Sequence, residues 1–148
     1  MRVMGARSIS AAALGLLVVL AIGQAGAVSP SYRVIVNAEN GMTTLDRKFL
    51  TDAFLKKTTR WPNGAFIRPV DLGADSAVRR RFSEDVLNRS VAAVKSYWQQ
   101  LIFSGRAIPP PELEAEADII QYVARYRGAI GYVSANGELA GVRVVSVK

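Results

Sequence analysis

The pattern of apolar and polar residues after residue 31 alternates between strand-like and helical periods. Tyr32–Asn37 is rich in β-branched and aromatic residues, which predicts a strand. Apolar residues then recur at helical spacing, and they predict a helix over 44–55 that Thr44 can cap. A Pro-Asn-Gly turn ends this region, and a short strand is expected over 65–70. The first half of this segment therefore predicts strand, helix and strand.

The second half predicts three helices followed by two strands. A turn at 73–76 leads into a helix that Asp75 or Ser76 can cap, and another helix begins near Ser90 and ends at Ser104–Gly105. The remaining predicted elements are a helix over 113–127, a buried strand over 129–133 and a final strand over 142–147. An Asn-Gly turn between the last two predicts a hairpin or two neighbouring strands. This order predicts an α/β fold, with helices packed on a small mixed sheet.

The N-terminal segment has the features of a secretory signal. Arg2 and Arg7 precede an apolar run over 9–22, and Ala25–Ala27 supplies small residues in an A-x-A arrangement. The run is shorter than the roughly 20 residues that span a bilayer, which argues against the alternative of an uncleaved anchor. We therefore expect cleavage after Ala27, no stable membrane anchor afterwards, and a periplasmic or secreted protein.

Removal of residues 1–27 would leave 121 residues, which is enough for a single domain over 28–148. The chain has no cysteine, so this domain must be stabilised by packing rather than by disulfides. Its 17 basic and 12 acidic side chains give a net charge of +5. This charge suits an anionic small ligand or an anionic surface, and it is equally compatible with a solvated basic face.

The residue types exclude much catalytic chemistry. Without histidine or cysteine, the chain cannot build a Ser-His-Asp or Cys-His nucleophile system or an ordinary zinc site. Neither phosphate-binding glycine motif of the nucleotide-binding folds occurs. Only Arg79–Arg81 resembles the basic stripe of a nucleic-acid-binding module. We therefore expect no enzyme activity, no metal or other cofactor, and no nucleic-acid partner.

The best candidate for a ligand site is the turn and helix start between residues 71 and 80. Free N–H groups at Ser76 and Ala77, the helix dipole, the Ser76 hydroxyl and the Arg79 guanidinium together suit a tetrahedral oxyanion. The alternative is that Asp75 and Ser76 only cap the helix while the arginines face water. A second helix start at Thr43 and Thr44 offers the same combination more weakly.

Several segments also occur together in an order that is typical of one family. The most specific is G-A-I-G-Y-V over 128–133; the others are V-I-V-N over 34–37, L-D-R-K-F-L-T-D-A-F-L-K over 45–56, W-P-N-G over 61–64, I-R-P-V over 67–70, R-R-R-F-S-E-D-V-L over 79–87, Y-W over 97–98 and I-F-S-G-R over 102–106. This series resembles the phosphate ABC transporter substrate-binding proteins. The resemblance covers nearly all of the chain after residue 27.

The resemblance implies the type 2 periplasmic-binding-protein fold, in which two α/β lobes close on a ligand. This chain has room for about one lobe. In full-length relatives a Gly-Ser-Gly-Thr turn before a helix holds the phosphate, and Gly73–Ser76 takes its place here, so that the location and Ser76 carry over. The implied function is an exported domain that binds phosphate or a related oxyanion in connection with an ABC permease. The alternative is an exported interaction or accessory protein that has lost ligand binding or shares its site with a second exported protein.

Overall fold

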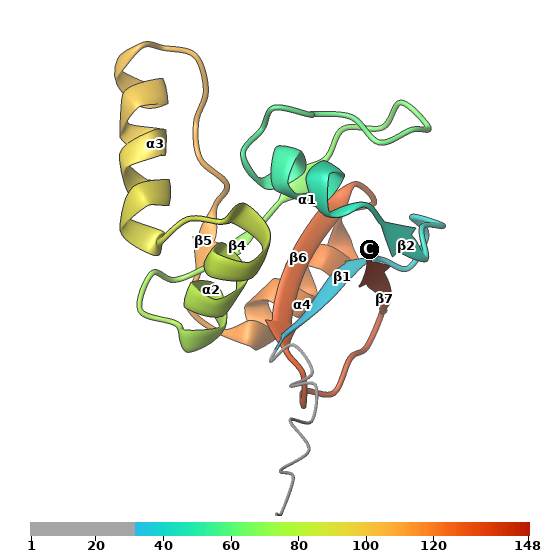
Figure 1. Cartoon of the computed structure of the whole chain (residues 1–148). Helices are drawn as coiled ribbons and strands as arrows, with labels where there is room; N and C mark the ends of the chain where they lie inside the picture. The colour runs from blue at the N-terminus through green and yellow to red at the C-terminus, as the bar shows by residue number, and fades with distance from the viewer. Residues whose placement is uncertain (1–31) are drawn as a thin grey trace, which may run out of the picture.

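The computed structural model describes residues 32–148, and the predicted signal lies outside them (Figure 1). A five-stranded sheet has the order β2-β7-β1-β6-β3. The central strand β1 (Tyr32–Asn37) is antiparallel to its neighbours β6 (Ala129–Ser134) and β7 (Val142–Val147). The edge strands β2 (Thr44–Leu45) and β3 (Arg68–Pro69) run parallel to β7 and β6. The predicted small mixed α/β sheet is therefore confirmed.

The end of the chain forms neither the predicted hairpin nor two neighbouring strands, because β1 lies between β6 and β7. Ile35 of β1 is paired with Gly131 on one side and with Val144 on the other. Since β6 and β7 both run antiparallel to β1, they point in the same direction. The loop over 135–141 must therefore return along the sheet before β7 begins, as Figure 1 shows.

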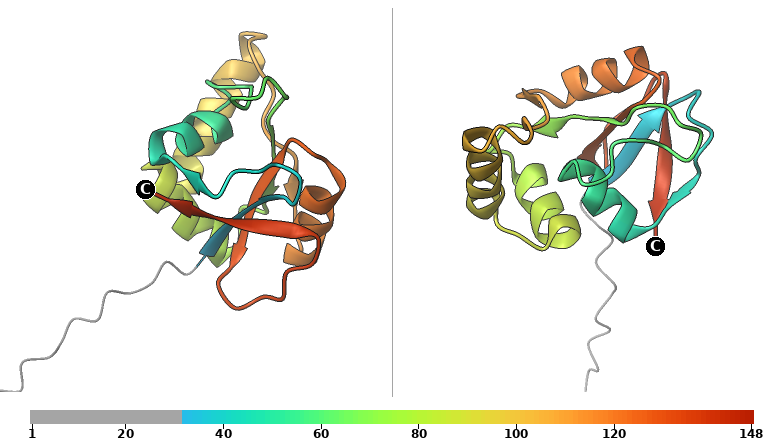
Figure 2. Two further views of the ribbon diagram at one scale, coloured as in Figure 1. Left: turned by 90° about the vertical axis from the view of Figure 1, so that its right-hand side faces the viewer. Right: turned by 90° about the horizontal axis from the view of Figure 1, so that it is seen from above.

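Helices cover both faces of this sheet (Figure 2). One face packs on α4 (Glu116–Arg125), and the other packs on α1 (Arg47–Phe54) and α2 (Ala77–Phe82). A π-helical turn, η1 (Ser83–Leu87), continues α2, and α3 (Val91–Phe103) stands beside it, away from the sheet (Figure 1). The short strands β4 (Asp71–Leu72) and β5 (Glu112–Leu113) form a separate parallel pair.

Alternation along the strands distributes the core between the two faces. Asn37 faces α4, where its amide nitrogen donates to Val123 O and Ala124 O, each at 2.9 Å. Tyr132 faces the other way and stacks on Phe82, with 3.8 Å between the ring centroids. Among residues 32–148, the buried apolar cluster runs from Tyr32 to Val145, and all of these residues are present in a chain that begins at Val28.

Local sequence signals explain where most helices begin and end. Ser76 caps α2 by accepting from Arg79 N at 3.2 Å, and Ser90 caps α3 in the same way. Gly105 adopts the left-handed conformation after α3, with φ +64°. The predicted Thr44 cap is wrong, because Thr44 is paired with Ser146 in the sheet and Asp46 caps α1 instead.

Two element bounds also differ from the predictions. The strand expected over 65–70 is limited to β3, Arg68–Pro69, and Phe66 is exposed in the loop before it. The helix expected over 113–127 is limited to α4, which spans Glu116–Arg125. Gly128, which follows it, is a close-approach position: a Cβ there would lie 2.0 Å from Phe66 O. The start of β6 and the loop before β3 therefore approach each other too closely to leave room for a side chain at Gly128.

Candidate functional site

A buried polar network lies directly behind the turn that the sequence predicts as a site. Asp71 and Arg79 are each only 3% exposed. The Tyr132 hydroxyl donates to Asp71 Oδ1 at 2.6 Å, and Arg79 Nη1 lies 3.1 Å from the same oxygen. Arg79 Nη1 also donates to Leu72 O at 2.7 Å. These contacts tie α2 to β4 and β6.

Burial has the largest effect on the pKa values of Asp71 and Tyr132 in this network. It raises the pKa of Asp71 to about 6, although the Arg79 charge and the Tyr132 hydrogen bond lower it. Burial likewise raises the pKa of Tyr132 well above its ordinary value, and the Asp71 charge adds to the increase. The network therefore contains one carboxyl group, Asp71, that titrates in a mildly acidic range.

The structure places the predicted site residues in two separate regions. Ser76, Ala77 and Arg79 share the start of α2, whereas Thr43 and Thr44 lie at β2. α2 packs over β1 and β6, whereas β2 is an edge strand beside β7. The prediction that Thr43 and Thr44 form a similar helix start is wrong.

The side chains at the α2 turn carry out structural roles. Ser76 Oγ accepts the capping hydrogen bond, and the Arg79 guanidinium is held against Asp71. Asp75 is exposed, and so is Ala77, the first residue of α2. The Ser76 hydroxyl proton and the first N–H groups of α2 are thus the parts of the predicted site that remain suited to contact an anion.

Carboxylates surround this turn. Besides the buried Asp71, Glu112 Oε1 lies 3.5 Å from Arg79 Nη1. The Glu114 carboxylate packs so closely on the turn that a Cβ at Gly73 would lie 2.5 Å from it. Asp75 adds a further negative charge at the surface. Their combined repulsion opposes the binding of a dianion at this helix start.

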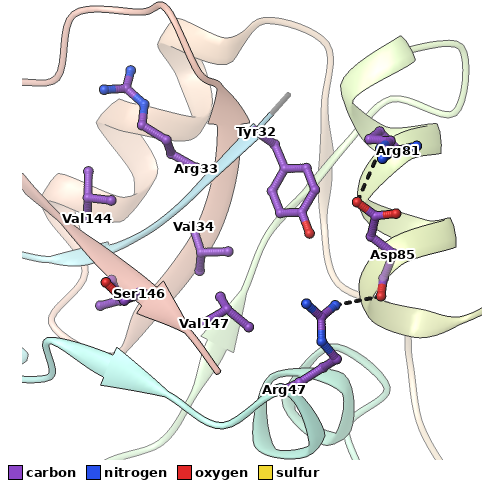
Figure 3. A pocket seen from close by; sticks show the side chains of 10 residues that line it. Tyr32, Arg33, Val34, Arg47, Arg81, Asp85, Val144, Ser146 and Val147 are labelled. Atoms are coloured by element: carbon purple, nitrogen blue, oxygen red, sulfur yellow. Dashed lines mark hydrogen bonds and ion pairs between the residues drawn. The ribbon is translucent and has the colours of Figure 1, made fainter. Parts of the chain in front are cut away.

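A second candidate site is a cationic pocket at one end of the strands of the five-stranded sheet (Figure 3). It encloses about 480 Å³ where β2 and β7 end, where β1 begins, and where α1 begins. Its lining residues are Tyr32, Arg33, Val34, Arg47, Arg81, Asp85, Val144, Val145, Ser146 and Val147. Since β2, β7, β6 and β3 all point the same way, this is the carboxyl edge of the sheet, where open α/β sheets hold their ligands. We refer to it as the arginine pocket.

Two arginines from different helices meet across Asp85 in the arginine pocket. Arg81 Nε lies 3.1 Å from Asp85 Oδ2, and Arg47 Nη1 donates to Asp85 O at 2.6 Å. Figure 3 shows the Tyr32 hydroxyl pointing toward Arg47 and Asp85. Burial raises the pKa of this hydroxyl, and the Asp85 charge adds to the increase. The two guanidinium groups of Arg47 and Arg81 face a single carboxylate, that of Asp85, so the pocket has a net positive charge. The Tyr32 hydroxyl lies beside them as a neutral hydrogen-bond donor.

Arg33 contributes less directly to this pocket. Its guanidinium points away from Tyr32 (Figure 3), and Nε donates to Ser134 O at 3.4 Å. The sequence analysis did not single out Arg47 as a site residue, because Arg47 lies 34 residues from Arg81 and nothing in the sequence shows that the two side chains meet. It also treated Arg79–Arg81 as one cluster, whereas Arg79 is buried, Arg80 is exposed and Arg81 lines the pocket.

Within residues 32–148, no group of three or more acidic, histidine or cysteine side chains could hold a metal ion. No helix in the described part of the chain is both long and apolar enough to cross a bilayer.

The architecture is that of one lobe of the phosphate ABC transporter substrate-binding proteins, as the order of sequence segments indicated. An ABC-type phosphate transport receptor from Vibrio cholerae superimposes with a TM-score of 0.62 at 18% identity, over 79% of this chain and 46% of that one. A putative phosphate ABC transporter substrate-binding protein from Clostridium perfringens, solved with bound phosphate, gives 0.62 at 20% identity, over 79% and 44%. PstS from Borrelia burgdorferi gives 0.63 at 15% identity, over 80% and 47%.

These similarities concern the fold. The chain spans less than half the length of each of these three solved proteins, so it matches a single lobe. No family model matches the sequence, and no curated protein matches it. The similarity therefore establishes the fold of one lobe of these proteins. The identity of any ligand has to be inferred from the residues of this chain.

Proposed function

We propose that the chain is an exported substrate-binding-like domain that binds phosphate or a related oxyanion in connection with ABC-type transport. The fold supports this proposal, because the similar structures are described as phosphate transport receptors, one of them with phosphate bound. None of the three is described as an enzyme. The proposal that the ligand is an oxyanion depends on where this lobe offers positive charge to a small ligand.

The arginine pocket is the observation that carries the proposal. It combines a concave site of about 480 Å³ with Arg47, Arg81 and the Tyr32 hydroxyl, at the edge of the sheet that general fold rules favour. Guanidinium groups bind phosphate oxygens through paired, charge-assisted hydrogen bonds. The turn at Ser76 is surrounded by more carboxylates than the arginine pocket, which contains only Asp85 among residues 32–148. We therefore place the oxyanion in the arginine pocket rather than at the start of α2.

Substitution of the pocket arginines tests this placement. For the chain from Val28, phosphate should raise the melting temperature more than sulfate or chloride at matched ionic strength. Arg47→Gln and Arg81→Gln should each weaken phosphate binding by about tenfold or more, because each removes a charged hydrogen-bond donor. The measurement is the dissociation constant obtained by fitting the rise in melting temperature to its logarithmic dependence on phosphate concentration.

Two matched variants distinguish the arginine pocket from the α2 turn. Arg80→Gln makes the same change at an exposed position on the same helix, and it should leave the phosphate response intact. Ser76→Ala should lower the melting temperature by removing the cap, yet keep the phosphate-induced shift. If Ser76→Ala abolished that shift while the pocket variants kept it, the site would be the turn that the sequence predicts.

Export is a separate part of the proposal. A-x-A at Ala25–Ala27 follows an apolar run of suitable length, so the processed protein should begin at Val28. Intact mass and N-terminal sequencing of the protein recovered from the exported fraction of a bacterial host should give this start. A recovered chain that still carried residues 9–22 would contradict cleavage.

A binding partner that completes the site is the second candidate function. A single lobe leaves the arginine pocket open to water, which weakens polar contacts with a ligand. An ABC permease or a second exported protein could cover it. Under this alternative, phosphate alone should give no selective thermal shift, and the shift should appear when the partner is added.

A further inference from the structure

The end of α3 forms an apolar projection that the proposed oxyanion site does not use. Phe103 is 90% exposed, and Ile108, in the segment that follows, is 71% exposed. Ile102 is 49% exposed beside them. Figure 1 shows α3 and the returning connector as the part of the molecule that extends furthest from the sheet. We refer to Ile102, Phe103, Arg106 and Ile108 as the α3 tip.

The backbone at this tip is already hydrogen-bonded internally. Gly105, with φ +64°, lets Arg106 N donate to Leu101 O at 2.9 Å and its own N–H donate to Ile102 O at 3.0 Å. Ser104 Oγ donates to Gln100 O at 2.9 Å. The carbonyls of Gln100, Leu101 and Ile102 therefore accept hydrogen bonds within the tip, which lowers the cost of moving this end of the helix out of water.

Charge is distributed unevenly around the projection. Between Asp85 and Glu112, the sequence contains no acidic residue, although the chain has 12 in total. The same interval contains three exposed cations, Arg89, Lys95 and Arg106. Arg106 belongs to the α3 tip, Lys95 lies within α3, and Arg89 lies just before α3. This surface is complementary to an extended anionic surface.

We propose that the α3 tip docks reversibly on an anionic phospholipid membrane. Phe103 and Ile108 enter the boundary between headgroups and acyl chains, while Arg106 lies at the level of the lipid phosphates. A few exposed apolar side chains with nearby cations give reversible association rather than an anchor. The inference does not depend on oxyanion binding, because it uses neither Arg47 nor Arg81.

Vesicle sedimentation tests this docking with the chain from Val28, which lacks the apolar run of residues 9–22. Vesicles rich in phosphatidylglycerol should bind the protein, and phosphatidylcholine vesicles should bind at least about tenfold less. The double variant Phe103→Ser and Ile108→Ser should lose at least about tenfold in binding, because two apolar side chains no longer enter the membrane. Arg106→Gln should weaken binding and reduce its dependence on salt.

Phe66→Ser is the matched control for this experiment. Phe66 is 61% exposed and lies under the Arg60 guanidinium, 3.9 Å from the ring centroid, so it is another surface aromatic beside a cation. Its substitution should leave vesicle binding unchanged. Equal loss in the Phe66 variant, or full binding by the double variant, would overturn the proposal. So would an absence of vesicle binding together with self-association that the double variant abolishes, since a second copy would then cover the tip.

Discussion

Arg79→Met is expected to destabilise the folded protein by about 3–5 kcal/mol at pH 7.5. Arg79 Nη1 lies 3.1 Å from Asp71 Oδ1, and both side chains are 3% exposed. Methionine fills a similar volume but supplies no positive charge. The substitution therefore leaves a buried carboxylate without its counter-charge. Urea unfolding at fixed pH measures the loss in the free energy of unfolding.

The size of this loss should depend on pH. Burial raises the pKa of Asp71 from 3.8 to about 6 in the folded protein. Between these two values the folded state holds a proton that the unfolded state has released, so the free energy of unfolding decreases as pH rises through this interval. Arg79 is among the groups that lower this pKa, and its removal raises the pKa further. The variant should thus recover stability at pH 5, where Asp71 is protonated.

Arg80→Met is the control for Arg79→Met. Arg80 is the next residue of the same helix and is exposed, so the same substitution should change stability by less than about 0.5 kcal/mol at both pH values. Equal costs for the two variants, or a pH-independent cost for Arg79→Met, would show that the buried ion pair does not govern the stability of α2.

Phe82→Ala should destabilise the protein by about 3–5 kcal/mol, because it empties the centre of the aromatic cluster. Phe82 is fully buried and stacks on Tyr132, with an interplanar angle of 6°. It also contacts Phe54 of α1 at 4.8 Å and Tyr32 of β1 at 5.5 Å between ring centroids. Removal of its ring weakens the packing of both helices on the sheet. The measurement is again urea unfolding.

Phe66→Ala gives the comparison for this change. It removes the same ring from a side chain that is 61% exposed, so it should cost a small fraction of the Phe82→Ala effect. A cost for Phe82→Ala below about 1 kcal/mol would contradict the packing of α2 on Tyr132.

Local patterns in the sequence predicted the elements more accurately than their pairing. Ser76, Ser90 and Gly105 mark helix ends through contacts with residues a few positions away, so short-range signals were sufficient. The position of β1 between β6 and β7 depends on pairing across about 100 residues, and the Asn136-Gly137 turn favoured the wrong neighbour. Thr44 was misassigned for the same reason, since its partner Ser146 is distant in the sequence.

The candidate site shows a similar division. The helix start at Ser76 could be predicted because capping is local, whereas the burial of Arg79 depends on Asp71 and Tyr132 from separate strands. The position of Asp71 between the apolar residues Val70 and Leu72 was an available signal for a buried carboxylate. The meeting of Arg47 with Arg81 had no such signal, because only the fold brings α1 and α2 to one pocket.

Calorimetric titration of the chain from Val28 with phosphate, alongside sulfate and chloride at matched ionic strength, tests the central claim most directly. The account predicts saturable binding of one phosphate per chain, stronger than that of either other anion, and about tenfold or more weaker in Arg47→Gln. An absence of saturable heat with phosphate into the millimolar range would contradict an oxyanion-binding function for this lobe on its own.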